Sequence, residues 1–576
     1  MRSGARRWQL ALFALACASC GAEPSGQGPG APELEDGPVR FEDATAELGL
    51  DVLHVATRTG ERYMPEVIGA GVALADFNRD GAPDLFVVGG GQFAAGPRPE
   101  SARDRLYLND GKGHLEDVSE AWGVGGVGHG MGAAVGDHDG DGWPDLVTTS
   151  FGGGLRLLRN TGTGFEDVTD AAGLAADRRW STSAGFLDAD GDGDLDLFVV
   201  HYVLYDEDTA LRCWLNERHI YCPPALYEAE ADALWINQGD GTFVDGSEAA
   251  GLKAHPTKGL ALVLGDIDWD GDIDAFVAND STRNLLFVND GSGTFDERGR
   301  IAGVAYDESG RAFAGMGADL TDVDGNGLLD ISCTNYQDET TNIYLQRQGG
   351  VFRDRSYALG VGASAQEKLS FGVDFVDVDN DGDEDLFVAN GHIDDGIASV
   401  SERVSFAQQN SLFLLDGQRF EDISDRAGDA LRLVEVTRGL ASADLDGDGR
   451  LDLVLSNNGG RARILRNVTE GAEGRAVLLW LEGAAPNTTA IGARVEATVG
   501  ERTLLREVRG ASSYASFNDP RIHLGLGDAA ATGPVRVLWP DGGEQVLGPL
   551  SPGTYRLVQG GEPEPITPGA GVVAPR

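Results

Sequence analysis

Short apolar runs recur along the chain, and each begins directly after an aspartate. The runs read DLFVV, DLVTT, DLFVV, DAFVA, DISCT, DLFVA and DLVLS, and they start at Asp84, Asp145, Asp196, Asp274, Asp330, Asp385 and Asp452. Runs of this length, rich in β-branched and aromatic residues, predict buried strands. Between them lies a second pattern of an apolar run, a glycine turn and Phe-x-Asp, as in LWINQGDGTFVDGS. This pattern predicts a hairpin that carries the two outer strands of each unit.

The order of these patterns indicates a closed ring. Six hairpins lie between the apolar runs, but the last run is followed by ARILRN without a Phe-x-Asp partner, and the missing piece, FEDATAELGL, stands at residues 41–50. An N-terminal strand can complete the last unit only if the units close on themselves. The sequence therefore predicts an all-β, seven-bladed β-propeller at residues 39–470. We expect a small β-rich domain at residues 475–558 and a disordered tail at residues 559–576.

An acidic loop of nine residues, D-x-[DN]-x-[DN]-x-x-x-D, leads into each apolar run. Calcium takes roughly six to eight oxygen ligands, and acids at positions 1, 3 and 5 of a tight loop can face one ion. Position 6 is glycine in every copy, as a sharp turn requires. Position 7 varies freely, which fits a residue that offers only its carbonyl, and position 9 is the candidate bidentate ligand. Plain Asp-Gly hairpin turns would explain the glycine but not the fixed acids.

Four residues in each loop are therefore candidate ligands, and we expect up to seven Ca²⁺ ions. By loop, in the order of positions 1, 3, 5 and 9, they are Asp76, Asn78, Asp80 and Asp84; Asp137, Asp139, Asp141 and Asp145; Asp188, Asp190, Asp192 and Asp196; Asp266, Asp268, Asp270 and Asp274; Asp322, Asp324, Asn326 and Asp330; Asp377, Asp379, Asp381 and Asp385; and Asp444, Asp446, Asp448 and Asp452. Two carboxylates ~4 Å apart repel by on the order of 4 kcal/mol at an effective dielectric of about 20, so crowded loops favour a cation. His138, at position 2 of the second loop, is expected to point outward.

The repeats resemble FG-GAP/VCBS repeats, such as those of integrin α-chain propellers. The resemblance rests on the acidic loop and on the motif G-x-G-x-x-x-x-D, seen in GAGVALAD, GMGAAVGD and GMGADLTD. IGARVEATVG, REVRGASSYASFNDPRIHLGLGD and VRVLWPDG resemble the ASPIC/UnbV module, which follows such a propeller in the cartilage acidic protein family and its bacterial relatives. The resemblance spans residues 40–555 and implies that the loop Asp and Asn residues bind calcium. Asn78 and Asn326 replace acids, but an amide still offers an oxygen.

Composition excludes several classes of function. The chain has 93 Asp and Glu against 45 Lys and Arg, a net charge of −48. A nucleic-acid-binding protein needs a basic surface, and so does a protein held to anionic lipid by basic patches, so both are disfavoured. The 83 glycines, the 9 tryptophans and the regular apolar runs favour a folded chain that holds many cations over a disordered acidic one.

The N-terminus has the pattern of an export signal. A basic start precedes an apolar stretch at residues 8–19, which is too short to span a bilayer. The string CASCG resembles a bacterial lipobox with Cys20 as the lipidated residue, although Cys17 stands where Leu is usual. We therefore expect a signal peptide at residues 1–19 and a flexible tether at residues 20–38. The protein would be an outer-membrane, cell-surface or periplasmic one that touches the membrane only through this lipid, and ordinary cleavage nearby is the alternative.

The remaining cysteines divide into a pair and a single residue. Cys213 and Cys222 are close in sequence, in the string RCWLNERHIYCP, and we predict that they pair because an exported protein meets an oxidising compartment. Cys333 lies in an apolar run and is predicted to be a buried free thiol. Insertions at residues 201–233 and 390–410 lengthen two units, and long loops on a rigid scaffold often carry function.

The sequence shows no catalytic motif: it lacks H-E-x-x-H, G-x-S-x-G and a Walker loop. One group of residues in the first insertion could line a site, although packing of a long loop is the simpler interpretation: His201, Tyr202, Trp214, His219 and Tyr221. A second group, in the C-terminal module, could bind a ligand or form a hydrogen-bonded structural turn, and we favour the turn: Arg509, Tyr514, Asn518, Asp519, Arg521 and His523.

These observations lead to three hypotheses of function. The first is a calcium-stabilised binding, adhesion or scaffold module of the cell envelope, without catalysis, for an unknown protein or glycan ligand. The second is a hydrolase, which predicts a pocket at the propeller mouth with a perturbed acid or histidine outside the acidic loops. The third is an assembly factor that docks through its C-terminal module, so that deletion of residues 471–576 would leave the ring folded.

Overall fold

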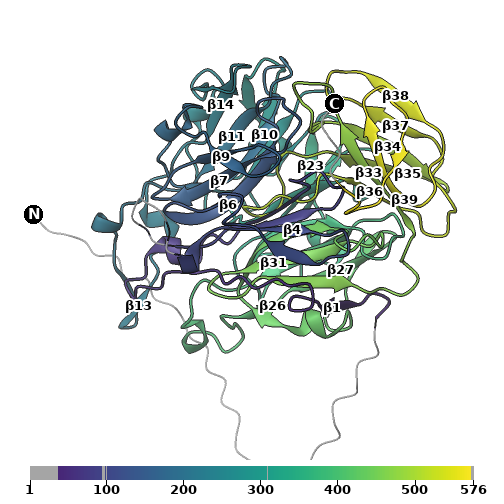
Figure 1. The fold of residues 1–576 in the computed structure, drawn as a ribbon. Coiled ribbons are helices and arrows are strands. Elements are labelled where there is room, and N and C mark those ends of the chain that lie inside the picture. The colour runs from purple at the N-terminus through teal and green to yellow at the C-terminus, as the bar shows by residue number, and fades with distance from the viewer. Residues whose placement is uncertain (1–36, 92, 94–97, 99, 308, 572–576) are drawn as a thin grey trace, which may run out of the picture. The chain divides into compact units, whose positions relative to one another are not determined.

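The computed structural model describes residues 37–91, 93, 98, 100–307 and 309–571. The expected signal peptide, the lipidation of Cys20 and the tether up to residue 36 lie outside the described residues. Strands dominate the fold (Figure 1). Helix within the described residues is limited to α1 (Gly299–Ala302), α2 (Ser356–Leu359) and the 3₁₀ turns η1 (Met64–Val67), η2 (Glu100–Ala102), η3 (Leu174–Ala176), η4 (Glu207–Thr209), η5 (Pro224–Leu226), η6 (Leu252–Ala254), η7 (Ile397–Ser399) and η8 (Asp429–Arg432). In the part of the chain that is described, no helix combines the length and the apolar character needed to cross a membrane.

Seven antiparallel sheets of four strands follow the sequence repeats, and we call each of them a blade. In order they are β2 (Val72–Ala75), β3 (Asp84–Val87), β4 (Arg105–Asn109) and β5 (Leu115–Asp117); β6 (His129–Gly136), β7 (Asp145–Phe151), β8 (Arg156–Asn160) and β9 (Phe165–Asp167); β10 (Ser181–Leu187), β11 (Asp196–His201), β14 (Ala233–Asn237) and β15 (Phe243–Asp245); β16 (Gly259–Gly265), β17 (Asp274–Asn279), β18 (Leu285–Asn289) and β19 (Phe295–Glu297); β20 (Ala318–Thr321), β21 (Asp330–Cys333), β22 (Asn342–Arg347) and β23 (Val351–Asp354); β24 (Ser370–Val376), β25 (Asp385–Asn390), β27 (Ser411–Asp416) and β28 (Arg419–Asp422); and β30 (Thr437–Ala443), β31 (Asp452–Asn457), β32 (Arg463–Asn467) and β1 (Phe41–Asp43).

The blades form a closed, propeller-like ring. The first strands contact one another in the cycle β2, β6, β10, β16, β20, β24, β30 and back to β2. The N-terminal strand β1 pairs with β32, with Phe41 opposite Asn467, and so completes the last blade. The all-β, propeller-like fold predicted from the sequence is confirmed, and the short strand β1 closes the ring as the position of residues 41–50 before the first run predicted.

The hydrophobic core lies between neighbouring blades. One cluster combines Val72 and Leu74 of the first blade with Ala441 and Val454 of the last, and similar clusters join other neighbours. Because each inner strand is covered on both faces, it reads in the sequence as a continuous apolar run rather than an alternating one. Two small sheets of two strands lie outside the blades: β12 (Cys213–Leu215) with β13 (Arg218–Ile220), and β26 (Gln408–Gln409) with β29 (Val434–Glu435).

The C-terminal module consists of two further four-stranded sheets. Their orders are β36 (Ile522–Gly525), β33 (Ala476–Glu482), β39 (Gly553–Val558) and β40 (Glu564–Pro565); and β35 (Arg502–Glu507), β34 (Arg494–Val499), β37 (Val535–Leu538) and β38 (Glu544–Leu547). Strands β33 and β39 run parallel, whereas the other pairs are antiparallel. Both sheets share one core with the second and third blades.

A loop of this module fills the centre of the ring, and we call residues 510–519 the axial segment. Its backbone bonds to the first strands of several blades: Ala73 pairs with Phe517, Ala318 with Ser513, Ala133 N donates to Ala515 O at 3.2 Å, and Leu264 N donates to Ala511 O at 3.4 Å. Hydroxyls of the segment accept further first-strand N–H groups, from Val72 to Ser516 Oγ at 3.2 Å and from Val373 to Ser513 Oγ at 3.3 Å. Hydrogen bonds therefore join the ring and the module, and the described residues between 37 and 571 form one compact unit.

The axial segment explains the second glycine of the G-x-G motif in the first two blades, whereas a Cβ on Gly317 of the fifth blade would lie 2.1 Å from Phe371 O of its neighbour. A Cβ on Gly71 would lie 2.0 Å from Ala515 O, and one on Gly132 would lie 2.7 Å from Thr182 O and 2.8 Å from Ala515 O. The backbone of the segment approaches the first strands so closely that no other side chain fits there.

The expectation of a disordered tail at residues 559–576 is wrong for residues 559–571. Strand β40 pairs with β39, and Gly569 N donates to Asp80 O at 3.1 Å. Proline and glycine suit this segment because it packs in an irregular path against the first blade rather than because it is unfolded. Residues 572–576 lie outside the described residues.

Candidate metal centres in the acidic loops

Each acidic loop connects the first strand of a blade to the second. In the first loop, Asp76 Oδ1 accepts Asp80 N at 3.0 Å and Asp76 Oδ2 accepts Gly81 N at 2.8 Å. The glycine at position 6 has a φ between 79° and 100° in all seven loops. Because this region of backbone conformation strains residues with a β-carbon, the turn requires glycine, as the sequence predicted.

The turn gathers the predicted acids. The ligand atoms of each of the following groups lie within 4.8 Å of one another: Asp137, Asp139 and Asp141; Asp188, Asp190 and Asp192; Asp266, Asp268 and Asp274; and Asp322, Asp324 and Asp330. Asn326 keeps the arrangement of the acid that it replaces, because its Oδ1 accepts Leu328 N at 2.8 Å as Asp80 Oδ1 accepts Ala82 N at 2.9 Å. The sequence spacing thus translates into a local cluster of oxygens.

The donor set suits a hard cation. At position 3 of two loops, Asp190 Oδ1 and Asp446 Oδ1 are buried, and no described residue donates a hydrogen bond to them. A buried carboxylate oxygen without a partner is costly, and a cation removes that cost. Clustered carboxylate and amide oxygens are the ligands that calcium prefers.

Burial and crowding perturb the acids of these loops. Burial, reinforced by the charge of Asp448, raises the pKa of Asp444 to about 7. Burial also raises the pKa of Asp188 to about 6 and that of Asp330 to about 8, with neighbouring loop carboxylates adding to each. A divalent cation acts in the opposite direction, because it favours the charged carboxylates.

The closing aspartate at position 9 also ties the loop to the third strand. In the first blade, Asp84 Oδ2 accepts Phe77 N at 2.9 Å and Asp84 Oδ1 accepts Asn109 N at 2.9 Å. The same pair of bonds recurs in the other six blades. Each oxygen keeps a lone pair that could face a cation, so the bidentate role of position 9 stays a prediction.

A side-chain amide at the end of the third strand links neighbouring blades, and we call it the bridging amide. Asn160 Nδ2 donates to Phe77 O of the preceding blade at 2.9 Å and to Pro144 O of its own loop at 3.0 Å. The equivalent bonds join Asn109 to Leu445, Asn237 to His138, Asn289 to Ala189, Gln346 to Ile267 and Asn467 to Val378. In the sixth blade, Leu415 occupies this position and makes no such bond. This role was not among the predictions from the sequence, although an Asn recurs there at the end of the third strand of most blades.

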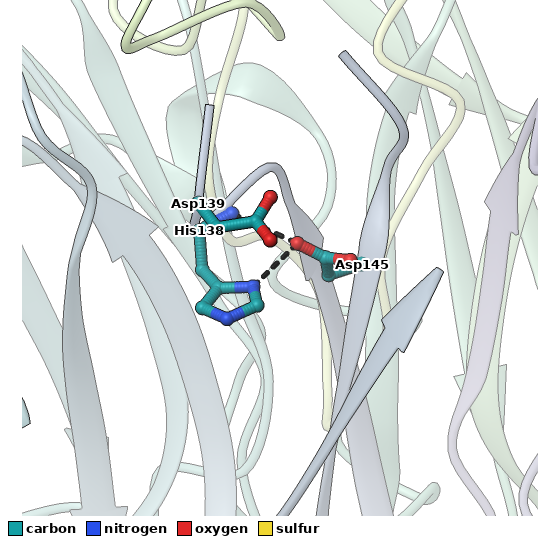
Figure 2. A group of neighbouring side chains, drawn as sticks. All are labelled: His138, Asp139 and Asp145. Atoms are coloured by element: carbon teal, nitrogen blue, oxygen red, sulfur yellow. Dashed lines mark hydrogen bonds and ion pairs between the residues drawn. The ribbon is translucent and has the colours of Figure 1, made fainter. Parts of the chain in front are cut away.

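The prediction that His138 points outward is wrong. The residue is 5% exposed and its Nδ1 lies 2.5 Å from Asp145 Oδ2 (Figure 2). Burial lowers the pKa of His138, but the hydrogen bond and charge of Asp145 outweigh it and raise the pKa above its ordinary value. The cause is positional, since position 2 faces the space between blades and holds a buried apolar residue in the other loops: Phe77, Ala189, Ile267, Val323, Val378 and Leu445.

The C-terminal module packs on this end of the ring. Thr488 Oγ1 donates to Asp137 Oδ2, and Arg502 pairs with Asp383 at 2.6 Å. Its six candidate residues all contact the ring: Arg509 pairs with Asp319, Tyr514 Oη accepts Gly69 N at 3.3 Å, Asn518 Nδ2 donates to Asp374 Oδ1 at 2.7 Å, Asp519 N donates to Ser442 O at 3.3 Å, Arg521 lies 3.7 Å from Asp76 Oδ2, and His523 Nε2 lies 3.4 Å from Gly449 O. All of them except Tyr514 also line a cavity of about 90 Å³, so the structural turn stays a prediction.

The first insertion is held by the disulfide that the sequence predicted. Cys213 and Cys222 are bonded, with their Cα atoms 5.1 Å apart, and Cys333 is a buried free thiol. The aromatic and histidine residues of the insertion do not converge on one point: His201 is buried beside Asp177, whereas Trp214 stacks on His219 and is 64% exposed.

Comparison with known proteins identifies two kinds of module in the chain. Residues 76–148, 137–199, 266–331 and 322–388 match the FG-GAP-like repeat, and residues 483–564 match ASPIC and UnbV. The chain therefore contains FG-GAP-like repeats and a C-terminal ASPIC/UnbV domain. It is homologous to cartilage acidic protein 1 over most of its length: identity is 28% over 510 residues with the mouse protein, covering 83% of this chain and 71% of that one, and 28% over 504 residues with the human protein, covering 83% and 70%.

Two solved lectin structures show a distant likeness. An Agrocybe aegerita lectin that recognises terminal N-acetylglucosamine has 16% identity and a TM-score of 0.37, covering 70% of this chain and 95% of that one. A lectin from Burkholderia pseudomallei has 11% identity and a TM-score of 0.39, covering 69% and 95%. Likeness at this level carries no information on the ligand of this protein.

Proposed function

We propose that this protein is a calcium-stabilised binding or scaffold module of the cell envelope that acts without catalysis. The observation that carries the proposal is the acidic loop, which recurs seven times with one geometry and gathers carboxylates that repel one another. In each loop, positions 1, 3 and 5 would supply side-chain oxygens, position 7 a carbonyl and position 9 a carboxylate. Calcium would neutralise these charges and hold the connection between first and second strands.

The expected contribution of calcium is comparable to the stability of a domain. Extracellular calcium sites have dissociation constants of roughly 10⁻⁴–10⁻³ M, and at about 1 mM calcium each site then stabilises the fold by roughly 0.4–1.4 kcal/mol. Seven independent sites would give ~3–10 kcal/mol, against a typical net stability of ~5–15 kcal/mol. Calcium would thus decide whether the ring is folded outside the cell.

Titration calorimetry with calcium on the purified protein tests this proposal. We expect close to seven sites, and a rise in melting temperature as calcium is added. Replacing Asp188, Asp190 and Asp192 by alanine should remove one site and lower the melting temperature in calcium but not in EDTA. A matched control replaces three exposed acids outside the loops, Asp51, Asp429 and Asp528, whose side chains are 81%, 97% and 103% exposed. Binding of few or no calcium ions would refute the proposal.

Export, a lipid anchor at Cys20 and an extracellular protein or glycan partner remain part of the proposal. They rest on the basic and apolar start of the chain, the lipobox-like string and the net charge of −48. That charge also disfavours a nucleic-acid partner. The ligand class of the relatives is not transferred to this chain.

A further inference from the structure

A cavity of about 420 Å³ opens at the end of the ring that lies away from the acidic loops. The loops follow the last residues of the first strands, whereas the cavity is lined by residues at the beginning of these strands: Leu260, Met316 and Phe371. The centroids of the aromatic rings of Phe371 and of Tyr514 in the axial segment lie 5.0 Å apart, so the axial segment packs against one wall of the cavity. The lining is largely apolar, with Met64, Val67 and Ile68 contributed by η1 and the residue after it.

The two long insertions close over this cavity. Leu215 and Ile220 of the first insertion and Ile397 and Val400 of the second all line it. The insertions are joined by a bidentate ion pair, in which the Arg218 guanidinium donates to Asp394 at 2.7 and 2.6 Å. The disulfide between Cys213 and Cys222 joins the two strands of the hairpin β12–β13, which carries Arg218. The two insertions, which are far apart in the sequence, are thus held together and cover the cavity, and we call them its roof.

Two carboxylates, those of Asp280 and Glu339, add negative charge to the otherwise largely apolar lining of this cavity. Asp280 is 7% exposed; its Oδ2 accepts the Tyr202 hydroxyl at 2.6 Å and its Oδ1 accepts the Ser281 hydroxyl at 2.9 Å. Glu339 Oε2 accepts Ala314 N at 2.8 Å, while no described residue donates a hydrogen bond to its Oε1. Burial raises the pKa of both carboxyl groups, and the charge of Asp280 adds to the shift at Glu339.

Three cations near the two carboxylates are engaged by other groups: Arg218 by Asp394, Arg311 by Asp307, and Lys258 by Pro224 O at 2.8 Å. The buried Arg438 guanidinium lies 3.9 Å from the ring centroid of Phe371 and donates to backbone carbonyls of Val67 and Gly391. Lys258 stabilises the charge of Asp280, and both oxygens of Asp280 already accept hydrogen bonds. Of the two carboxylates, Glu339 is therefore the one with a free oxygen for a ligand. Tyr202 and Tyr336 line the same cavity, and aromatic faces attract cations as carboxylates do.

We propose that this cavity binds a small hydrophobic amine, with its apolar body against Met316 and Phe371 and its ammonium group on Glu339. The volume lies within the range of ligand pockets, and a mainly apolar lining with a few polar groups is typical of them. The site does not depend on calcium binding to the acidic loops. The hydrolase hypothesis also predicts a pocket with a perturbed acid, and Glu339 fits that description. A hydrophobic amine site accounts for the apolar lining and the carboxylate without a reaction.

A series of three probes of one size and different charge tests the proposal: phenethylamine, 2-phenylethanol and phenylacetate. Binding to the full protein in saturating calcium is measured by saturation-transfer NMR and by competition. We expect phenethylamine to bind at least about tenfold more tightly than 2-phenylethanol, because the ammonium adds a charge-assisted hydrogen bond. We expect no binding of phenylacetate. Failure of the amine to bind, or equal binding of the amine and the alcohol, would overturn the proposal.

Two variants assign the binding to this cavity. Glu339→Gln should weaken phenethylamine at least about tenfold and leave 2-phenylethanol unchanged, whereas Asp338→Asn, a neighbouring exposed acid, should change neither. Ala314→Leu places bulk in the cavity and should abolish binding of both compounds, with a melting temperature that shows whether the protein is still folded. A folded Ala314→Leu protein that binds the amine as the unaltered protein does would show that the amine binds elsewhere.

Discussion

The bridging amide of Asn160 provides a sharp test of what holds the blades together. Asn160 is fully buried; its Nδ2 donates to Phe77 O and Pro144 O, and its Oδ1 accepts Gly162 N at 2.8 Å. We consider Asn160→Leu, because leucine occupies the same position of the sixth blade at residue 415. The variant keeps the size of the side chain roughly constant and removes three hydrogen bonds, one of which joins two blades.

The expected cost follows from these bonds. A hydrogen bond contributes about 0.5–1.5 kcal/mol net, and a buried partner left unsatisfied costs about 1–3 kcal/mol. Three buried partners left unsatisfied cost about 3–9 kcal/mol, and burial of a leucine side chain offsets about 1.5–3 kcal/mol, so the midpoints leave a net loss of about 4 kcal/mol in the free energy of unfolding. For a ring larger than a typical domain, this corresponds to a fall in melting temperature of about 2–8 °C.

Thermal unfolding in saturating calcium, followed by circular dichroism, measures this loss. The matched control is Leu415→Asn, where the new amide can reach the Val323 carbonyl of the preceding blade, so that new hydrogen bonds compensate for lost burial and the melting temperature changes little. A surface substitution usually changes stability by no more than about 0.5 kcal/mol. An Asn160→Leu protein that melts within about 1 °C of the unaltered protein would show an effect of that size and would refute the role of the amide. Equal losses in both variants would show that packing, rather than the bond between blades, decides stability.

Three further predictions concern the hub, the C-terminal module and the N-terminus. Gly71→Ala places a Cβ 2.0 Å from Ala515 O and should lower the free energy of unfolding by about 1–3 kcal/mol or more. Gly548→Ala, at a position with open space around it, should change that free energy by no more than about 0.5 kcal/mol. Urea unfolding compares the two variants, and equal stabilities would contradict the close approach of the backbone. Deletion of residues 471–576 should prevent folding of the ring, because the first strands lose the partners of Val72 and Val373; a soluble monomer with a cooperative melt would contradict this. Cys20→Ser should abolish incorporation of labelled palmitate in cells, and an unaltered protein that takes up no label would support ordinary signal cleavage instead.

The sequence predicts the ring because its determinants are local. The acids, the glycine at position 6 and the apolar run after Asp84 lie within a few residues of one another, and the position of Phe41 before the first loop reveals the closure. The disulfide was equally accessible, since Cys213 and Cys222 share one insertion.

The features that the sequence did not reveal depend on contacts between distant segments. His138 is buried because position 2 faces a neighbouring blade, and Asn160 bonds to a residue 83 positions away. The axial segment meets strands that lie more than 400 positions earlier, as for Ser516 and Val72. No local pattern encodes such a meeting, and the roof of the cavity likewise depends on Arg218 and Asp394, 176 positions apart.

The axial segment also has a consequence for the time at which this protein can fold. During synthesis the N-terminal part of a chain emerges first, and contacts of long sequence separation form slowly. Val72 of the first blade waits for Ser516, 444 positions later, before its N–H has a partner. Every blade is therefore synthesised before the axial segment that joins them, and Val72 and Val373 of two first strands expose unpaired N–H groups until the last fifth of the chain arrives. For that whole interval, an almost complete but open ring must be kept from pairing with other strands.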